Sequence, residues 1–245
     1  MIYVKRSLGQ NFLKDLNIIK KITNITEITN KDILEIGPGE GALTNEIMKN
    51  NPKSLTLIEK DDSLFKKLKL KYNNDNKIKI YNEDILKFNL EEKIKKNTII
   101  FGNLPYNISS QILVKIIRFK KWPPKFSALI FMFQKEMADR ILAKVNSKNY
   151  GRLSILSNWK FNIKKIIDIN PNSFYPKPKV DSSLLVFVKK KEYQKFKNPK
   201  NLEFITRVFF NQRRKKIKKP LNQLFKNPNN IIERLKLNID LRPQN

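Results

Sequence analysis

Four consecutive residues, Asn103-Leu104-Pro105-Tyr106, combine the side chains that could hold a planar amine. Pro105 fixes a turn, while the Asn103 side chain and the Leu104 backbone each offer a carbonyl oxygen to an NH₂ group. The Tyr106 ring could stack on a base and favour positive charge developing on its amine nitrogen. Such an amine attacks with its own lone pair, so no general base is needed, in keeping with a sequence that contains no His. Taken alone, the motif could also be an ordinary strand-to-helix turn.

A glycine-rich segment, Glu35-Ile36-Gly37-Pro38-Gly39-Glu40-Gly41-Ala42, follows an expected strand and opens an expected helix. Glycines there let the backbone turn tightly and approach a ligand closely. Glu59 ends the next strand, where a carboxylate can accept hydrogen bonds from a ribose diol. Asp84 follows the third strand and could accept from an adenine amino group, although Asp at this position is more often a turn residue. The pattern predicts a nucleoside cofactor, and NAD and S-adenosylmethionine both satisfy it.

Short apolar runs alternate with helical patterns from Asp32 to Val188. This alternation predicts an α/β fold with a mainly parallel, seven-stranded sheet. The expected strands are Ile33–Ile36, Leu55–Ile58, Ile78–Tyr81, Thr98–Phe101, Ala128–Phe133, Ile163–Ile169 and Leu184–Val188. Helical spacing is clearest at Leu64, Leu68 and Tyr72, and at Ile108, Ile112, Leu113, Ile116 and Ile117.

The composition changes after Val188. Residues 189–245 contain 17 Lys and Arg against 4 Asp and Glu, whereas residues 1–188 contain 34 against 18. Apolar spacing in the C-terminal part predicts helices around Leu202–Phe209 and Leu221–Phe225. We therefore expect a first domain over residues 1–188 and a small, basic, all-helical domain over residues 189–245, with Lys189–Lys200 as the linker.

The 245 residues carry a formal net charge of +29 and contain no Cys and no His. The charge favours nucleic acid as the partner, with a membrane surface as the weaker alternative. The missing residue types argue against disulfides, thiolate metal sites, serine-protease chemistry, zinc hydrolysis and most dehydrogenases. We expect no metal and no membrane span, and Met1–Arg6 does not resemble a signal peptide, so a cytoplasmic protein is expected.

In this order, the motifs resemble those of the small-subunit ribosomal RNA adenine N6-dimethyltransferases, the kasugamycin-sensitivity 16S rRNA dimethyladenosine transferases. The resemblance covers nearly the whole chain. It is carried by Ser7–Leu13, Ile36–Gly39, Ile58-Glu59, Asp84, Phe101–Ser109, Gln134–Glu136, Asn146–Lys148, Tyr150–Ser154, Phe174, Pro176, Pro178–Ser182 and Phe210–Lys215.

The resemblance implies a Rossmann-like class I methyltransferase domain that uses S-adenosyl-L-methionine. It implies cofactor binding by Asn11, Leu13, Gly37, Glu59, Asp84 and Asn103, with Asn103, Leu104, Tyr106 and Phe174 handling a flipped adenine. The implied reaction is N6 dimethylation of two adjacent adenines in the 3′-terminal hairpin loop of small-subunit rRNA, inside an immature ribosomal subunit. We expect a monomer that also assists ribosome biogenesis, and RNA phosphate contacts from Arg213, Arg214, Lys215 and Lys216.

Two other functions remain open at this point. One is a large-subunit rRNA adenine N6-methyltransferase, which shares the fold and a similar Asn-Leu-Pro-Tyr motif. The other is an RNA-binding assembly factor in which methylation is secondary or lost. The family also continues with another helix beyond its final Arg-Pro, whereas this sequence ends at Leu241–Asn245, so the expected C-terminal domain is shortened.

Overall fold

The computed structural model describes residues 4–245, and its contacts divide the chain into two compact units. The first contains Met1–Ala138 and Phe161–Lys191, and the second contains Asp139–Lys160 and Glu192–Asn245. The expected first domain ends at residue 188, close to the junction at Lys191. The structure differs from that expectation in one respect: the segment Asp139–Lys160 groups with the C-terminal helices. Residues 1–3 of the segment Met1–Arg6, for which we expected no signal peptide, lie outside the described residues.

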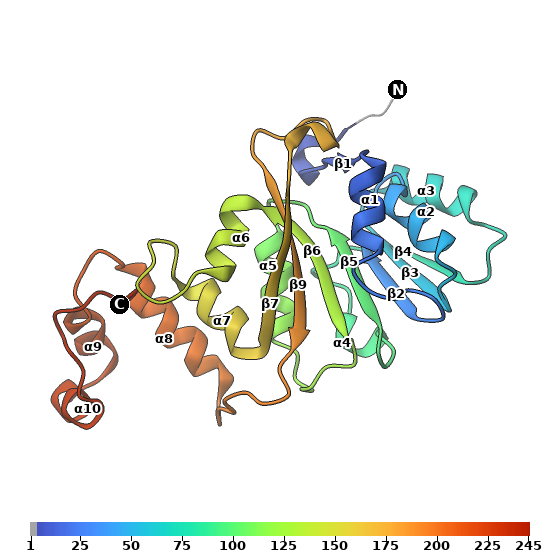
Figure 1. The fold of residues 1–245 in the computed structure, drawn as a ribbon. Coiled ribbons are helices and arrows are strands. Elements are labelled where there is room, and N and C mark those ends of the chain that lie inside the picture. The colour runs from blue at the N-terminus through green and yellow to red at the C-terminus, as the bar shows by residue number, and fades with distance from the viewer. Residues whose placement is uncertain (1–3) are drawn as a thin grey trace. The chain divides into compact units, whose positions relative to one another are not determined.

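The first unit is built on a seven-stranded sheet with the order β4-β3-β2-β5-β6-β9-β7 (Figure 1). Strands β4, β3, β2, β5 and β6 are parallel to one another, and β9 runs antiparallel to both β6 and β7. The bounds are β2 Asp32–Ile36, β3 Ser54–Glu59, β4 Ile78–Asn82, β5 Ile99–Asn103, β6 Ala128–Gln134, β7 Phe161–Ile169 and β9 Ser182–Lys189. The predicted mainly parallel sheet is confirmed.

A second, two-stranded sheet was not predicted. Strands β1 (Phe12–Leu13) and β8 (Phe174–Tyr175) pair antiparallel, with Leu13 opposite Phe174. Two residues are too short a run to give a period-2 pattern, so the sequence does not reveal this pairing. Its consequence is that the N-terminal segment is tied to a part of the chain some 160 residues away.

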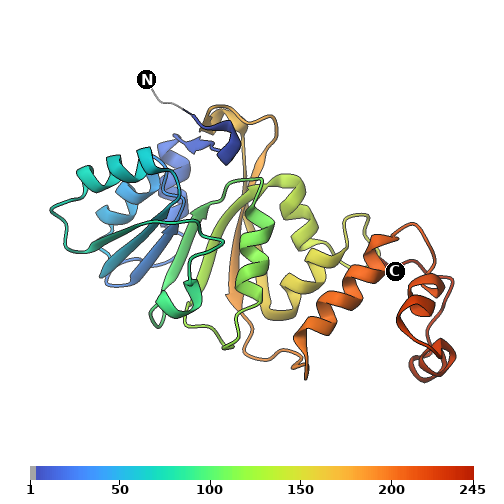
Figure 2. The same ribbon diagram turned by 180° about the vertical axis from the view of Figure 1, so that it is seen from behind.

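Helices cover both faces of the large sheet. Figures 1 and 2, which view the sheet from opposite sides, place α1 over one face and α5 over the other. The helices that begin in this unit are α1 Leu16–Thr23, α2 Ala42–Lys49, α3 Asp62–Lys71, α4 Leu90–Lys93, α5 Ser109–Ile117 and α6 Lys135–Leu142, with 3₁₀ turns at Arg6–Leu8 and Pro171–Ser173. Asp15 and Asp61 cap α1 and α3 by accepting hydrogen bonds from first-turn backbone N–H groups.

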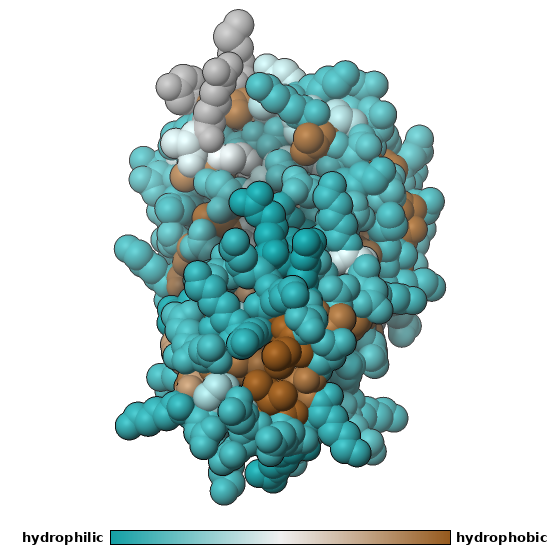
Figure 3. All heavy atoms as spheres, turned by 90° about the vertical axis from the view of Figure 1, so that its left-hand side faces the viewer, coloured by the Kyte–Doolittle hydropathy of each residue, from teal (hydrophilic) through white to brown (hydrophobic). Residues whose placement is uncertain are grey.

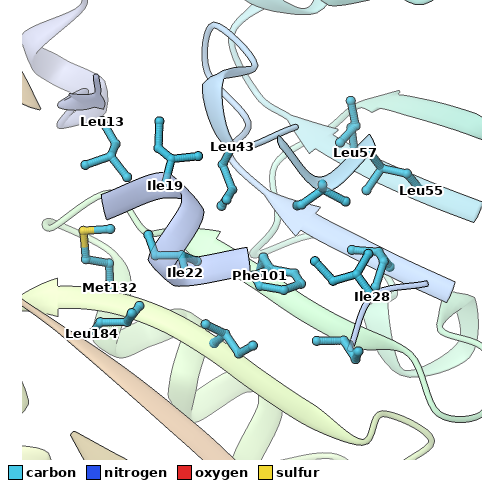
Figure 4. Close-up of a cluster of buried hydrophobic side chains, with 14 of the residues drawn as sticks. Leu13, Ile19, Ile22, Ile28, Leu43, Leu55, Leu57, Phe101, Met132 and Leu184 are labelled. Atoms are coloured by element: carbon cyan, nitrogen blue, oxygen red, sulfur yellow. The ribbon is translucent and has the colours of Figure 1, made fainter. Parts of the chain in front are cut away.

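One apolar core lies between α1, α2 and the sheet. Figure 4 shows Leu13 beside Ile19 of α1, with Leu43 of α2 and Phe101 of β5 nearby. Each of these side chains is buried. Burying a side chain of this size contributes about 1.5–3 kcal/mol to the free energy of unfolding. This core therefore stabilises the ends of the strands, which carry the polar residues described below.

The second unit is mostly helical. It contains the second half of α6, from Asp139, then α7 Arg152–Lys160, α8 Pro199–Asn211, α9 Lys218–Leu224 and α10 Pro228–Leu235. Pro199 at the first position and the Asn198 cap explain why α8 starts where it does. Helix α10 contains no buried residue. The helices expected around Leu202–Phe209 and Leu221–Phe225 are therefore present, and α10 was not predicted.

Candidate active site

A cavity of about 450 Å³ opens at the carboxyl ends of the parallel strands in the first unit. Its walls come mainly from the N-terminal segment, the loop after β2, the end of β3, the turn after β4 and the turn after β5, together with Tyr175 of β8. Ligands of open parallel sheets bind at such strand ends. The lining residues used below are Gln10, Asn11, Leu13, Glu35, Gly37, Gly39, Glu59, Asp84, Asn103, Leu104, Tyr106 and Tyr175.

The glycine-rich loop has the backbone conformation that only glycine adopts easily. Gly37, Gly39 and Gly41 all have positive φ angles, of 66°, 59° and 81°. A Cβ atom on Gly39 would lie 2.8 Å from the Phe12 ring, whereas one on Gly37 would meet no atom within 4 Å. The backbone at Gly37 is therefore open toward the cavity, and the loop leads into the N-terminus of α2, where an anionic group is favoured.

Glu59 holds this loop in place. Its carboxylate accepts hydrogen bonds from the backbone N–H of Gly39 at 3.1 Å and from that of Asp61 at 2.9 Å. Burial raises the pKa of Glu59, and these two hydrogen bonds oppose the rise. Each carboxylate oxygen keeps a second lone pair. The residue can therefore accept from a ribose diol without releasing the loop.

Asp84 is more exposed than Glu59, and hydrogen bonds from neighbouring residues hold its carboxylate in place. Its two oxygens accept from the Leu86 backbone N–H at 2.9 Å and from the Lys60 ammonium group at 2.8 Å. Burial raises the pKa of Asp84, but the Lys60 and Leu86 hydrogen bonds outweigh it and the net pKa is lowered. Asp84 therefore acts as a turn residue and also lines the cavity, while its expected hydrogen bond to an adenine stays a prediction.

Glu35 is a buried carboxyl group of the cavity wall to which the sequence assigned no role. It accepts a hydrogen bond of 2.6 Å from Thr44 in α2 and is 2% exposed. Burial raises its pKa to about 7; the Thr44 hydrogen bond opposes this rise, and the nearby Glu59 adds to it. A cationic ligand in the cavity would favour the ionised form of this group.

Asn103 ends β5 with its side chain in a defined orientation. The amide nitrogen donates to the backbone carbonyl of Asn11 at 2.8 Å. Within the described residues the amide oxygen makes no hydrogen bond, and Asn103 lines the cavity. The Leu104 side chain is buried against Gly102, where an added Cβ would lie 2.6 Å from it. Leu104 also lines the cavity, and the pairing of its carbonyl with the Asn103 amide oxygen stays a prediction.

Tyr106 borders the same cavity with its ring half-buried. The turn beneath it is closed by a hydrogen bond from the Ile108 N–H to the Pro105 carbonyl. Its hydroxyl group lies 2.6 Å from the Ser182 hydroxyl group. Burial raises the pKa of Tyr106 above its ordinary value, so the phenol is neutral at physiological pH. Ser182 was not singled out from the sequence as a site residue.

Phe174 is not in the cavity. It is 1% exposed and packs in the apolar core with α1 and α2, whereas its neighbour Tyr175 is 50% exposed and borders the cavity. The reason is the alternation of side chains along a strand, which sends Phe174 and Tyr175 of β8 to opposite sides. The structure therefore does not bring Phe174 together with Tyr106, and the aromatic residue of β8 that reaches the cavity is Tyr175.

The N-terminal segment closes one side of the cavity through contacts that the sequence could not reveal. Lys5 and Gln10 both contact the second carboxylate oxygen of Asp61, at 3.0 and 3.1 Å, while its first oxygen caps α3. These contacts hold Asn11 in reach of Asn103. Lys5 and Gln10 are separated from Asp61 by more than 50 residues, so no local pattern predicts the contact.

In the second unit, the four basic residues after α8 differ in their partners. Arg213 donates to the carbonyls of Lys148 and Tyr150 at 2.6 and 2.8 Å, and Lys216 pairs with Asp240 at 2.7 Å. Within the described residues, the exposed side chains of Arg214 and Lys215 make no hydrogen bond or ion pair. Figure 3 shows a face dominated by hydrophilic residues around a local hydrophobic patch.

Residues 4–245 contain no cluster of three or more acidic residues suited to a metal ion. No helix in this range has the length and hydropathy to span a bilayer.

Comparison with known proteins gives the same family from sequence and from structure. The sequence model of ribosomal RNA adenine dimethylases matches residues 2–241. The ribosomal RNA small subunit methyltransferase A of Pelagibacter ubique (strain HTCC1062) is 54% identical over 244 residues, covering 100% of this chain and 92% of that protein. The crystal structure of a dimethyladenosine transferase from Plasmodium falciparum has a TM-score of 0.75 and 30% identity, covering 94% of this chain and 84% of that one.

The fold is shared more widely. The 23S rRNA methyltransferase ErmE has a TM-score of 0.68 at 23% identity, with 94% of this chain and 92% of that chain covered. This similarity supports the Rossmann-like class I methyltransferase fold. The match over nearly all of the sequence and the high identity are decisive for the family: the chain belongs to the ribosomal RNA adenine dimethylases.

Proposed function

We propose that this enzyme transfers methyl groups from S-adenosyl-L-methionine to N6 of two adjacent adenines in the 3′-terminal hairpin loop of small-subunit rRNA, giving N6,N6-dimethyladenosine. The observation that carries the proposal is the Asn103 amide, whose nitrogen is bound to the Asn11 carbonyl at the cavity that Tyr106 also lines. A loop is a suitable target, because its bases are already unstacked and cost less to extrude.

The cofactor would lie in the cavity with its ribose at Glu59 and its adenine at Asp84. Gly37 and Asn11 would contact it through their open backbone and polar atoms, and Leu13 through the apolar wall. When bound, the cofactor supplies an electrophilic methyl group on a cationic sulfonium. Glu35 and Glu59 would add negative charge near that cation, which suits the chemistry of the residues present.

The target adenine would be held by the turn after β5. The Asn103 side-chain oxygen and the Leu104 carbonyl would accept from its N6 amino group, and the Tyr106 face would support the base. The lone pair of N6 is then directed at the methyl group, and the proton is lost to solvent after transfer. We retain Phe174 in this proposal only as core support for β8, with Tyr175 as the aromatic residue that borders the cavity.

RNA would be positioned by the second unit rather than recognised there base by base. The free side chains of Arg214 and Lys215 suit phosphate contacts, whereas Arg213 and Lys216 already have partners within the chain. In this proposal the protein acts as a cytoplasmic monomer on an immature small subunit, and binding to that particle also assists subunit assembly.

The proposal can be tested with radiolabelled cofactor and small ribosomal subunits that lack the modification. We expect N6,N6-dimethyladenosine at the 3′-terminal hairpin, and no product from mature, already modified subunits. Label in large-subunit rRNA instead would indicate the other substrate. Tight binding to the immature subunit without transfer would support an assembly factor and contradict the enzymatic proposal.

A further inference from the structure

The contact between Tyr106 and Ser182 joins a turn of the active site to the start of a central strand. The two hydroxyl oxygens are 2.6 Å apart, a short distance even for an O–H···O hydrogen bond. The residues are 76 positions apart in the sequence. Ser182 is completely buried, and a buried hydroxyl group normally requires a partner.

Ser182 is held more rigidly than Tyr106. As the first residue of β9, it lies between two strands, opposite Gln134 of β6 and Ile169 of β7. Tyr106 lies in a turn, and its ring can rotate about two side-chain bonds. The hydrogen bond therefore attaches the free end of a rotatable ring to a fixed point of the sheet.

The neighbouring serine provides an internal comparison. Ser183 is also completely buried and follows Ser182 in β9, but its hydroxyl group donates to Asp168 at 2.5 Å. Successive side chains of a strand point to opposite faces. Of two adjacent buried serines, only Ser182 contacts the active-site turn.

We propose that Ser182 is a positioning residue, which fixes the position of the Tyr106 ring so that the target adenine stacks on it in the orientation needed for methyl transfer. The inference rests on the proposed role of Tyr106 in holding the target base. The ring is then fixed at both ends: the Ile108-to-Pro105 hydrogen bond closes the turn at its base, and Ser182 holds its hydroxyl group. Fixing a contact group in its productive orientation is a recognised source of rate acceleration.

The decisive experiment is a double-mutant cycle with Ser182→Ala and Tyr106→Phe, measured as kcat, KM and cofactor Kd on unmodified small subunits. Each single variant is expected to lower kcat about fivefold to tenfold, the value of one net hydrogen bond, and to leave cofactor affinity unchanged. The double variant should be no slower than the slower single variant, because both changes remove the same contact. Ser182→Thr, which keeps a hydroxyl group, should recover most of the loss.

Ser183→Ala is the matched control. It removes a buried hydroxyl group from the adjacent position of the same strand, so it reports any general loss of stability. We expect it to lower the melting temperature while leaving kcat unchanged below that temperature. A kcat loss in Ser183→Ala equal to that in Ser182→Ala would overturn the inference.

A second measurement follows base stacking directly. An RNA hairpin with 2-aminopurine at the target position should lose fluorescence when the base stacks on Tyr106, and Ser182→Ala should weaken this quenching while Ser183→Ala does not. Additive losses in the cycle, or wild-type quenching in Ser182→Ala, would overturn the role of Ser182 alone. Wild-type kcat in Tyr106→Ala would instead overturn the proposed role of Tyr106.

Discussion

Polar residues around the cavity and basic residues after α8 are used in opposite ways. Around the cavity, Glu59, Asn103 and Tyr106 are at least half-buried and each makes a hydrogen bond within the chain. After α8, Arg214 and Lys215 are exposed and free of such contacts among the described residues. Buried, paired groups are fixed in direction, which chemistry requires. Exposed charges give a field and an adaptable contact, which phosphate binding requires.

The largest expected loss of activity follows from replacing Asn103. Replacing Asn103 with Ala removes the acceptor for the target amine, and we expect transfer to fall about 10²- to 10³-fold while cofactor and RNA affinities stay within about twofold. Single-turnover methylation and calorimetric cofactor titration measure the two properties separately. Asn50→Ala, which also loses an amide and one hydrogen bond, is the control. Turnover near that of wild type in Asn103→Ala would remove Asn103 from the mechanism.

A Glu35 variant tests how the protonation of this buried carboxyl group changes the free energy of unfolding. Its pKa is raised from 4.5 to about 7 by burial. Between these values the folded protein holds a proton that the unfolded chain has released, so the free energy of unfolding falls as the pH rises through this range. Glu35→Gln should remove about 2–3 kcal/mol of that fall.

Urea unfolding of both proteins at several pH values between 4 and 8 measures this difference. The change should be complete above pH 7, where Glu35 is ionised in both states. Parallel pH profiles for the wild type and Glu35→Gln would contradict the assignment.

Glu59 tests the hydrogen bonds of the glycine-rich loop. Its two oxygens accept from two different backbone N–H groups, and Gln has only one acceptor oxygen. One N–H group in Glu59→Gln would face another donor, so we expect cofactor binding to weaken by about 2 kcal/mol, or about 30-fold. Glu46→Gln in α2, where the carboxylate pairs with Lys49 and does not line the cavity, should bind the cofactor as the wild type does.

Substituting the basic residues after α8 should have the smallest effect, a loss of RNA affinity that depends strongly on salt. Changing Arg214 and Lys215 to Gln should weaken RNA binding about tenfold at moderate salt and reduce the slope of log K against log salt by up to about 1.8. Lys66→Gln with Lys67→Gln on α3 makes the same charge change elsewhere. Equal slopes for the two double variants would mean that the overall charge, rather than this site, attracts the RNA.

Local patterns and distant contacts differ in how far the sequence could predict them. The sheet, the glycine-rich loop and the turn at Asn103 were predictable because each depends on residues that are adjacent in the sequence. The orientation of Asn103 depends on Asn11, and that of Tyr106 on Ser182, across 92 and 76 residues. Phe174 shows the same limit: the motif could be found, but the side of β8 on which its ring lies depends on pairing with Leu13.

The central claim is that the cavity carries the chemistry and the basic residues carry RNA affinity. Single-turnover methylation at saturating RNA, compared between Asn103→Ala and the Arg214→Gln/Lys215→Gln variant, tests it most directly. We predict that saturation restores the wild-type rate in the basic-residue variant and leaves the transfer rate of Asn103→Ala about 10²- to 10³-fold below that of the wild type. A basic-residue variant that stays slow at saturating RNA, or an Asn103→Ala variant that recovers, would contradict this separation.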